Sequence, residues 1–306
     1  MKCLFTVYTP WVWRVRKAEG MIIENLFKQK RPVLSFEIFP PKKEAALLSI
    51  DETLSTLAKL NPDFISVTFG AGGSGGKNKT VELAKKIKEE YKIEPLVHLT
   101  CINHSEEEIR VLLKQLETAQ LKNILALRGD INPEVSPRHD FKYAGELVEF
   151  IKKNGDFHVS GACYPETHLE AADPISDIRN LKKKVDAGVG HLVSQLFFDN
   201  RVFYDFVEKV RIAGIDAPVE AGIMPVTNKA QIEKMVTMCG ASLPPKLEKI
   251  LNKYGGNKEA LFDAGMAYAI DQIVDLLSNE VEGIHIFTMN NPVVARRICD
   301  GIKNLI

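Results

Sequence analysis

The sequence Ile124-Leu125-Ala126-Leu127-Arg128-Gly129-Asp130 decides the fold. Its first four residues are apolar and stand between polar ones, a pattern typical of a strand buried on both faces. The strand ends abruptly in a cation, a glycine and a carboxylate. Such an ending is typical of the carboxyl-terminal end of a barrel strand, where apolar packing stops and catalytic groups are found. A strand-end turn capped by an exposed Asp130 is the alternative interpretation.

Other apolar runs alternate with helical patterns along the rest of the chain. We predict strands over 33–39, 64–68, 95–101, 123–127, 158–163, 191–197, 218–223 and 284–288. Helices are predicted over 44–60, 79–91, 106–120, 143–153, 174–187, 200–213, 228–280 and 292–304. Eight such units predict a single-domain (β/α)8 barrel over residues 21–306, since a doubly wound sheet would have fewer strands. We expect Met21 to lead directly into the first strand, and residues 1–20 to be an extension outside the core.

Composition excludes several classes of protein. Lys+Arg and Asp+Glu both number 40, so no global field favours nucleic acid or an anionic membrane. The five cysteines are scattered without a CxxC pair, which is typical of a reducing compartment. No apolar run approaches the roughly 18 residues of a membrane span. Residues 1–20 lack the cleavage site of a signal peptide, so we predict a cytoplasmic protein.

The first predicted strand carries a carboxylate among apolar neighbours. Glu37 stands between Phe36 and Ile38, with Phe39 following. Apolar surroundings tend to raise the pKa of a carboxyl group, which suits a general acid. The alternative is a structural glutamate inside the barrel, paired with a lysine or arginine.

The second strand runs into a glycine-rich segment, Thr68-Phe69-Gly70-Ala71-Gly72-Gly73-Ser74. We predict a loop here, because glycines allow the backbone to approach a ligand closely. The segment is not a P-loop, which would require glycine at position 71 and serine or threonine at position 78, where the chain has Ala71 and Asn78.

Histidines stand at two further strand ends. His98 lies on the third strand and His168 follows the fifth. They form neither a His-x-His pair nor a His-Glu-x-x-His motif, so we predict no metal site. The sequence assigns no role to His104, His139 or His158.

Five short motifs occur in order and together resemble one enzyme family. They are Ser35-Phe36-Glu37-x-Phe39-Pro40-Pro41-Lys42, Val67-Thr68-Phe69-Gly70-Ala71-Gly72-Gly73-Ser74, His98-Leu99-Thr100-Cys101, Leu127-Arg128-Gly129-Asp130 and Tyr164-Pro165-Glu166-x-His168. From residue 21 to the end the chain resembles the short, bacterial type of 5,10-methylenetetrahydrofolate reductase. The resemblance implies an FAD-binding barrel that passes a hydride from NAD(P)H to methylenetetrahydrofolate and yields 5-methyltetrahydrofolate by a ping-pong mechanism.

The resemblance also implies roles for individual residues. Glu37 matches the general acid that protonates a folate ring nitrogen, and Asp130 matches a carboxylate beside the flavin that favours a cationic iminium. The implied FAD positions are Thr68, Phe69, Ala71, His98, Arg128, Gly129, Asp130, Tyr143, Ala144, Tyr164, His168, Ala171, Asp177, Asn180, Lys183 and Lys184. The implied substrate positions are Glu37, Thr68, Asp130, Gln195 and Gln231. Lys183 and Lys184 would hold the pyrophosphate as point charges, and a solvated helix face is their alternative role.

The chain departs from the bacterial pattern around the folate and nicotinamide pocket. Met235 stands where the family has a stacking phenylalanine, Phe287 where it has tyrosine, and Asn291 where it has arginine. Residues 75–79, Gly-Gly-Lys-Asn-Lys, also replace a more charged sequence of the bacterial pattern. Two other functions stay open: a proline dehydrogenase-like flavin barrel, and a subunit of a one-carbon complex with another electron donor. The chain could accordingly form a homo-oligomer or bind an electron-transfer partner subunit.

Overall fold

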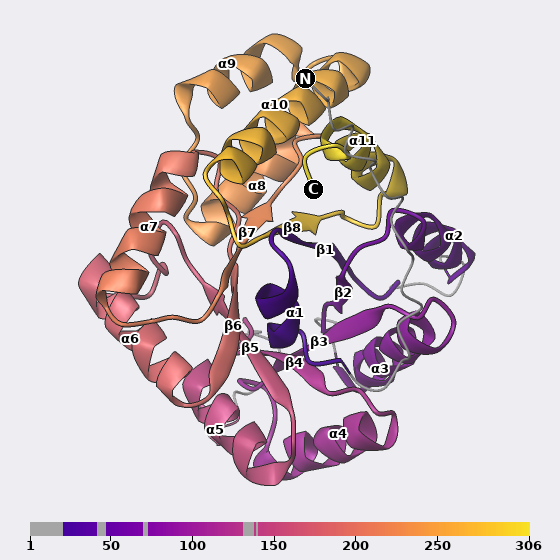
Figure 1. Ribbon diagram of the computed structural model, residues 1–306, viewed down its shortest axis with the longest axis vertical. Coiled ribbons are helices and arrows are strands. Elements are labelled where there is room, and N and C mark those ends of the chain that lie inside the picture. The colour runs from indigo at the N-terminus through magenta and orange to yellow at the C-terminus, as the bar shows by residue number, and fades with distance from the viewer. Residues whose placement is uncertain (1–20, 42–46, 70–72, 131–137, 139) are drawn as a thin grey trace, which may run out of the picture.

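The computed structural model describes residues 21–41, 47–69, 73–130, 138 and 140–306. In this part of the chain, parallel strands β1 to β8 pair in sequence order and close into a barrel, with helices around it (Figure 1). The strands are β1 Val33–Ile38, β2 Phe64–Val67, β3 Glu94–Thr100, β4 Asn123–Leu127, β5 His158–Cys163, β6 Val189–Ser194, β7 Val219–Ile223 and β8 Gly283–Phe287. The predicted (β/α)8 class is therefore confirmed. Residues 1–20 lie outside the described residues, so the predicted extension stays a prediction.

The helices follow the predicted alternation. They are α2 Leu47–Ala58, α3 Gly73–Glu89, α4 Glu106–Thr118, α5 Ala144–Asn154, α6 Pro174–Asp186, α7 Asn200–Ile212, α8 Lys229–Cys239, α9 Pro245–Tyr254, α10 Lys258–Ser278 and α11 Pro292–Ile302. The single helical region predicted over 228–280 is three helices. Gly240, at φ +69°, ends α8 in the left-handed conformation that glycine adopts readily, and Pro245 begins α9 at a position that suits proline. None of the described helices is long and apolar enough to cross a bilayer.

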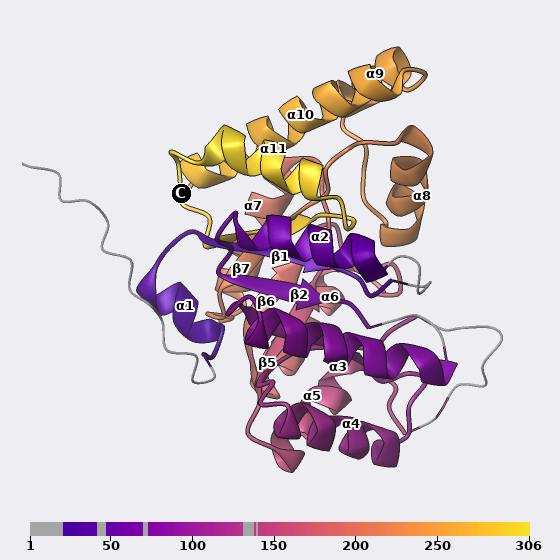
Figure 2. The ribbon, with the colours of Figure 1, turned by 90° about the vertical axis from the view of Figure 1, so that its right-hand side faces the viewer.

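A short helix precedes the first strand, contrary to the prediction that Met21 leads directly into it. Helix α1 spans Glu24–Gln29 and lies across the amino-terminal end of the barrel, opposite the end toward which the strands point (Figures 1 and 2). Ile23, Leu26 and Phe27 follow helical spacing and are buried against the apolar lower interior of the barrel. The helix therefore closes that end.

The glycine-rich segment after β2 also differs from its prediction. Helix α3 begins at Gly73, so part of the predicted loop is the first turn of a helix. Residues 70–72 lie outside the described residues. Each glycine costs about 1 kcal/mol relative to alanine in a helix, but the helix is anchored further along. The buried Thr80 hydroxyl donates to the carbonyl oxygen of Thr68, 3.1 Å away, and ties α3 to the end of β2.

Polar side chains of strands that are not neighbours form a hydrogen bond inside the barrel. Ser35 on β1 donates to Glu220 on β7 at 2.7 Å, although β8 separates these two strands in the sheet. A contact between strands that are not neighbours must run through the interior. Alternate residues of a strand face the same side, so Ser35 and Glu37 both project inward, and Glu37 lies nearer the carboxyl-terminal mouth.

Candidate active site

Glu37 occupies the inner face of β1 at the mouth of the barrel. Its Oε2 lies 3.6 Å from Nε2 of His98 on β3 and 3.7 Å from Nε2 of His285 on β8. The side chain of Glu37 is 21% exposed, whereas both imidazoles are buried. Strands from three positions around the barrel thus bring one carboxyl group and two imidazoles together, an arrangement suited to proton transfer.

The charge state of Glu37 differs from the prediction. Burial favours the neutral acid, but the electrostatic interactions with His285 and His98 act in the opposite direction, and the pKa of Glu37 is lowered. The expectation of a raised pKa was wrong, because it considered the apolar sequence neighbours and not the two imidazoles across the barrel. Burial itself lowers the pKa of His98 to about 4, so His98 is neutral at pH 7.

His285 and Ser35 are site residues that the sequence analysis did not identify. Nδ1 of His285 lies 2.6 Å from Oγ of Ser35, and the two residues are paired in the sheet between β8 and β1. The Ser35 hydroxyl donates to Glu220, and Nε2 of His285 lies 3.7 Å from Glu37, so Glu37, His285, Ser35 and Glu220 lie next to one another in that order. The alternation of inward positions could have found them, since residues 35 and 37 share a face, but the pairing of β1 with β8 joins distant parts of the sequence.

The end of β4 has the geometry that its sequence indicated. Gly129 has φ +84°, and a Cβ atom there would lie 2.9 Å from Cβ of Thr100. The carbonyl oxygen of Arg128 accepts from the backbone N–H groups of Cys101 and Ile102, at 3.1 and 2.9 Å. This bonding holds the turn against the end of β3. Asp130 is exposed directly beyond it.

Arg128 is part of a paired charge cluster. Its guanidinium contacts both carboxylate oxygens of Glu170, and the NH2–Oε1 distance is 2.7 Å. The hydrogen bond to Glu170 raises the pKa of Arg128, and the same bond lowers the pKa of Glu170. Glu170 is a partner that the sequence analysis missed. The pair joins the end of β4 to the segment that follows β5.

The segment after β5 packs its predicted site residues together. The rings of Tyr164 and His168 meet edge to face with centroids 4.6 Å apart. The backbone N–H of His168 donates to the Asp177 carboxylate at 3.0 Å. The backbone N–H of Ala171 donates to the carbonyl oxygen of His168 at 2.9 Å. Burial raises the pKa of Tyr164 to about 12, so its hydroxyl stays protonated at neutral pH. Asp177, in the first turn of α6, thus fixes this segment.

The remaining predicted FAD residues are more dispersed. Thr68 and Phe69 follow β2, Tyr143 and Ala144 begin α5, and Asn180 and Lys183 are exposed on α6. Lys184 is held against β5, because its amine donates to the carbonyl oxygen of Ala162. Of the two adjacent cations, Lys183 is therefore the accessible one. Ala71 lies outside the described residues.

The predicted substrate amides sit at the same end of the barrel. Gln195 directly follows β6, where its Oε1 accepts from the backbone N–H of Leu196 at 2.8 Å. Gln231 lies in the first turn of α8. Met235 and Phe287 are partly buried beside the apolar cluster around Leu196 and Phe198.

Asn291, at the position where the resemblance expected arginine, has a structural task. Its side chain accepts from the N–H groups of Val293 and Val294 and so caps the start of α11. A cap of this kind is worth about 1 kcal/mol.

A closed (β/α)8 barrel with titratable groups gathered at the carboxyl ends of its strands defines an α/β-barrel enzyme. Comparison with known proteins narrows this class. The family profile "Methylenetetrahydrofolate reductase" matches residues 22–303, and the chain belongs to this oxidoreductase family. Its members reduce 5,10-methylenetetrahydrofolate.

Curated relatives agree over most of the chain. The 5,10-methylenetetrahydrofolate reductase of Pectobacterium carotovorum is 35% identical over 271 residues, covering 89% of this chain and 90% of that protein. The Escherichia coli enzyme of the same name is 34% identical over 266 residues, covering 87% and 89%. Methylenetetrahydrofolate reductase (NADH) 1 of Arabidopsis thaliana is 34% identical over 283 residues, but the match covers only 48% of that longer protein.

A solved structure shares the fold. A protein from Clostridium thermocellum that binds two copies of 5-methyl-5,6,7,8-tetrahydrofolic acid has a TM-score of 0.65 and 12% identity. The match covers 93% of this chain and 99% of that one. At this identity the likeness supports the barrel architecture alone.

Proposed function

We propose that this chain reduces 5,10-methylenetetrahydrofolate to 5-methyltetrahydrofolate with an FAD bound at the mouth of the barrel, and that NAD(P)H supplies the electrons in a ping-pong sequence. The arrangement of Glu37 between His98 and His285 carries the proposal. The reaction needs one proton for the folate ring nitrogen, and Glu37 is a carboxyl group with proton-carrying neighbours at the end of the barrel where such enzymes bind substrates.

The residues around the mouth fit a flat, anionic cofactor. Large apolar side chains are exposed in the segment after β5 and at the start of α6, where Leu169 is 62% and Ile175 is 64% exposed. A bound ring system would cover such surface. Lys183 offers an exposed positive charge on α6, Arg128 is held in its pair with Glu170, and the left-handed Gly129 keeps a side chain out of the turn after β4. When bound, FAD would supply a carrier that accepts a hydride and releases it.

Each residue would then have a defined task. Glu37 gives its proton to the folate nitrogen and opens the five-membered ring. Asp130 places negative charge near the cationic iminium that results and stabilises it. Gln195 orients both substrates, since its amide offers donors and an acceptor. Because nicotinamide and folate would need the same position within about 3–3.5 Å of the reacting flavin atom, they would bind in turn.

The test is anaerobic and uses the purified protein as isolated. A flavin absorbance that NADH or NADPH bleaches, and that methylenetetrahydrofolate restores, would support every step of the proposal. A colourless protein that binds no added FAD would overturn it. If the protein is yellow and dithionite reduces its flavin but neither NADH nor NADPH does, then only the proposed electron donor is wrong.

A further inference from the structure

A second set of titratable groups lies deep in the barrel, below the proposed site. Nε2 of His191 on β6 lies 3.2 Å from Oε2 of Glu220 on β7, and both side chains are fully buried. Taking titratable side chains out of water is costly even when they are paired, so apolar packing alone does not account for this pair. The proposed activity of the mouth uses neither residue.

The pair is connected in both directions. Toward the mouth, Oε1 of Glu220 accepts from Ser35, whose Oγ lies 2.6 Å from His285, the imidazole beside Glu37. Toward the opposite end, Nδ1 of His191 lies 3.0 Å from Oγ of Ser160, which in turn is 3.4 Å from Nε2 of His158. The whole series of side chains therefore runs along the axis of the barrel.

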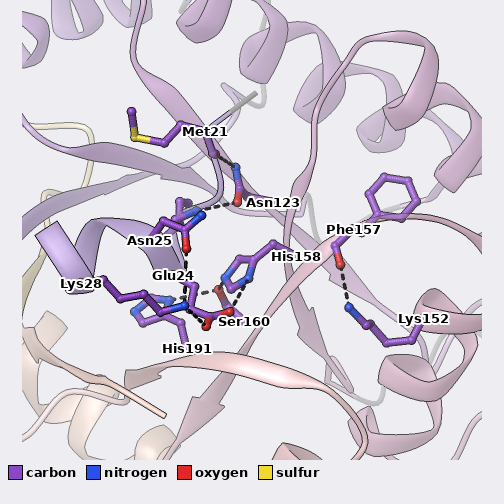
Figure 3. A network of polar contacts seen from close by, with 11 residues as sticks. Met21, Glu24, Asn25, Lys28, Asn123, Lys152, Phe157, His158, Ser160 and His191 are labelled. Carbon is purple, nitrogen blue, oxygen red and sulfur yellow. Dashed lines mark hydrogen bonds and ion pairs between the residues drawn. The ribbon is translucent and has the colours of Figure 1, made fainter. Parts of the chain in front are cut away.

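The series reaches solvent below helix α1. Nδ1 of His158 lies 3.7 Å from Oε2 of Glu24, whose side chain is 35% exposed and also contacts Lys28 at 3.0 Å. Figure 3 shows Glu24, His158, Ser160 and His191 pointing toward one another beneath this helix. The exposed carboxylate is thus an accessible outer end.

We propose that Glu220 and His191 pass protons from the amino-terminal end of the barrel to Glu37, through Ser35 and His285. The inference rests on the proposed role of Glu37 as the general acid. A flat ligand over the mouth would shield Glu37 from bulk water at the moment when its proton is consumed. A route through the barrel interior would supply the next proton to Glu37 from the amino-terminal end of the barrel.

The transfer balances as a series of single proton shifts without any change in electrons. Before a transfer, Glu220 carries a proton on Oε1 and the Ser35 hydroxyl rotates from Glu220 to Nδ1 of His285. The Nε2–H bond of His285 then breaks as an O–H bond forms on Glu37, and the Ser35 proton moves to Nδ1 of His285. Ser35 receives the proton of Glu220, and Glu220 receives the Nε2 proton of His191. Ser160, His158 and Glu24 restore the proton of His191 from solvent. Rotation of the Ser35 hydroxyl and half-turns of the imidazole rings and of the Glu220 carboxyl group return the donors to their starting positions.

The charged groups around His158, at the outer end of the route, indicate that this imidazole passes a proton on and does not hold an extra one. His158 faces Glu24 and Lys28 on α1, Lys152 on α5, and His191 on β6. Burial lowers the pKa of His158 to about 3, with the nearby cations adding to the effect. His158 is therefore neutral at rest and can accept a proton at one nitrogen only as it releases one from the other.

The test compares the two half-reactions of the flavin-loaded protein. Glu220→Gln keeps the shape of the side chain but breaks the route. We expect oxidation of the reduced flavin by methylenetetrahydrofolate to slow by about tenfold or more, less than the roughly 10²–10⁴-fold typical of losing the general acid itself. Reduction by NAD(P)H should be unchanged. The solvent deuterium isotope effect on the oxidative step should rise, and Glu220→Asp should recover part of the rate.

A matched control is Glu94→Gln, a partly buried glutamate near the same barrel end, which pairs with Lys88 at 3.1 Å outside the route. It should leave both half-reactions and the isotope effect unchanged. If Glu220→Gln does not fold, Ser160→Ala removes only one hydroxyl, with Ser278→Ala as its control. The Ser278 hydroxyl donates to the carbonyl oxygen of Val274 within α10, outside the barrel. The first serine variant should slow the oxidative step and the second should not.

Wild-type oxidative rates and isotope effects in Glu220→Gln or Ser160→Ala would overturn the inference, and the series would then be interior packing. Equal slowing in a route variant and its control would overturn it as well. The proposed function fails separately, if Glu37→Gln leaves the oxidative half-reaction intact. An independent readout is the imidazole nitrogen NMR spectrum, in which Glu220→Gln should change the tautomer of His285.

Discussion

Nε2 of His98 lies 3.6 Å from Oε2 of Glu37, across the barrel from β3 to β1 with β2 between them. Because burial lowers the pKa of His98 to about 4, the imidazole is neutral at pH 7. A neutral imidazole can orient the carboxyl group of Glu37, whose pKa is lowered by its interactions with His285 and His98.

Glu37→Gln should separate the two half-reactions. The amide keeps the shape of the side chain but cannot donate an acidic proton. Reduction of the flavin by NAD(P)H should survive, while oxidation by methylenetetrahydrofolate should fall by roughly 10²–10⁴-fold. Stopped-flow absorbance under anaerobic conditions measures both. An equal fall in the two rates would mean that Glu37 is structural.

Asp130→Asn should raise the midpoint potential of the flavin. A carboxylate near the cofactor disfavours its anionic reduced form, and the neutral amide would remove that effect. Because Asp130 is exposed, solvent will screen much of the interaction. An anaerobic redox titration gives the potential, with Asp140→Asn, an exposed aspartate on the next segment, as the control. A potential that is unchanged or lowered in Asp130→Asn would remove this residue from the flavin site.

Gln195→Ala should weaken both half-reactions, unlike Glu37→Gln. The amide directly follows β6 and would contact nicotinamide and folate in turn. Steady-state kinetics should give parallel lines in double-reciprocal plots, and the folate should compete with the nucleotide. Intersecting lines would contradict the shared position and indicate a separate point of electron transfer.

Gly129→Ala should destabilise the protein by roughly 1–2 kcal/mol from its left-handed backbone alone. The added Cβ would also lie 2.9 Å from Cβ of Thr100, so either the turn or the end of β3 must shift. Thermal and urea unfolding measure the loss. Gly145→Ala is the control, since nothing lies within 4 Å of its added Cβ. Equal stability of the two variants would show that the turn tolerates a side chain.

His158→Gln should reduce the loss of stability in acid. In the folded protein the pKa of His158 is about 3, below the value of about 6.5 in an unfolded chain. Between these values the unfolded chain binds more protons, so the contribution of His158 is fully present above pH 6.5 and declines as the pH falls toward 3. At pH 5 the loss amounts to about 2 kcal/mol.

Urea unfolding of His158→Gln and the wild type at pH 7.5 and pH 5 checks this. The difference in unfolding free energy between the two pH values should be about 2 kcal/mol smaller in the variant. Identical pH dependence would show that His158 takes up protons in the folded protein as readily as in the unfolded one.

The sequence alone determined the architecture and much of the mouth. Buried strands such as β4 contain continuous apolar runs, here 124–127, and the glycine and polar residues that end them are adjacent in sequence, so local patterns predicted both. Helix α1 was not predicted, because six residues are too few for helical spacing to be recognised in the sequence. The start of α3 was misplaced because glycine frequency indicates a loop, whereas anchoring to β2 decides the helix.

Only the tertiary structure decided which polar groups meet inside the barrel. Ser35 and Glu220 are 185 residues apart, and Ser35 and His285 are 250 apart. No local pattern can relate them, because their contact depends on closure of the sheet and on the pairing of β1 with β8. The same closure placed two imidazoles beside Glu37 and lowered a pKa that the sequence neighbours alone would have raised. Local sequence sets which side chains face inward, and the geometry of closure sets which of them meet.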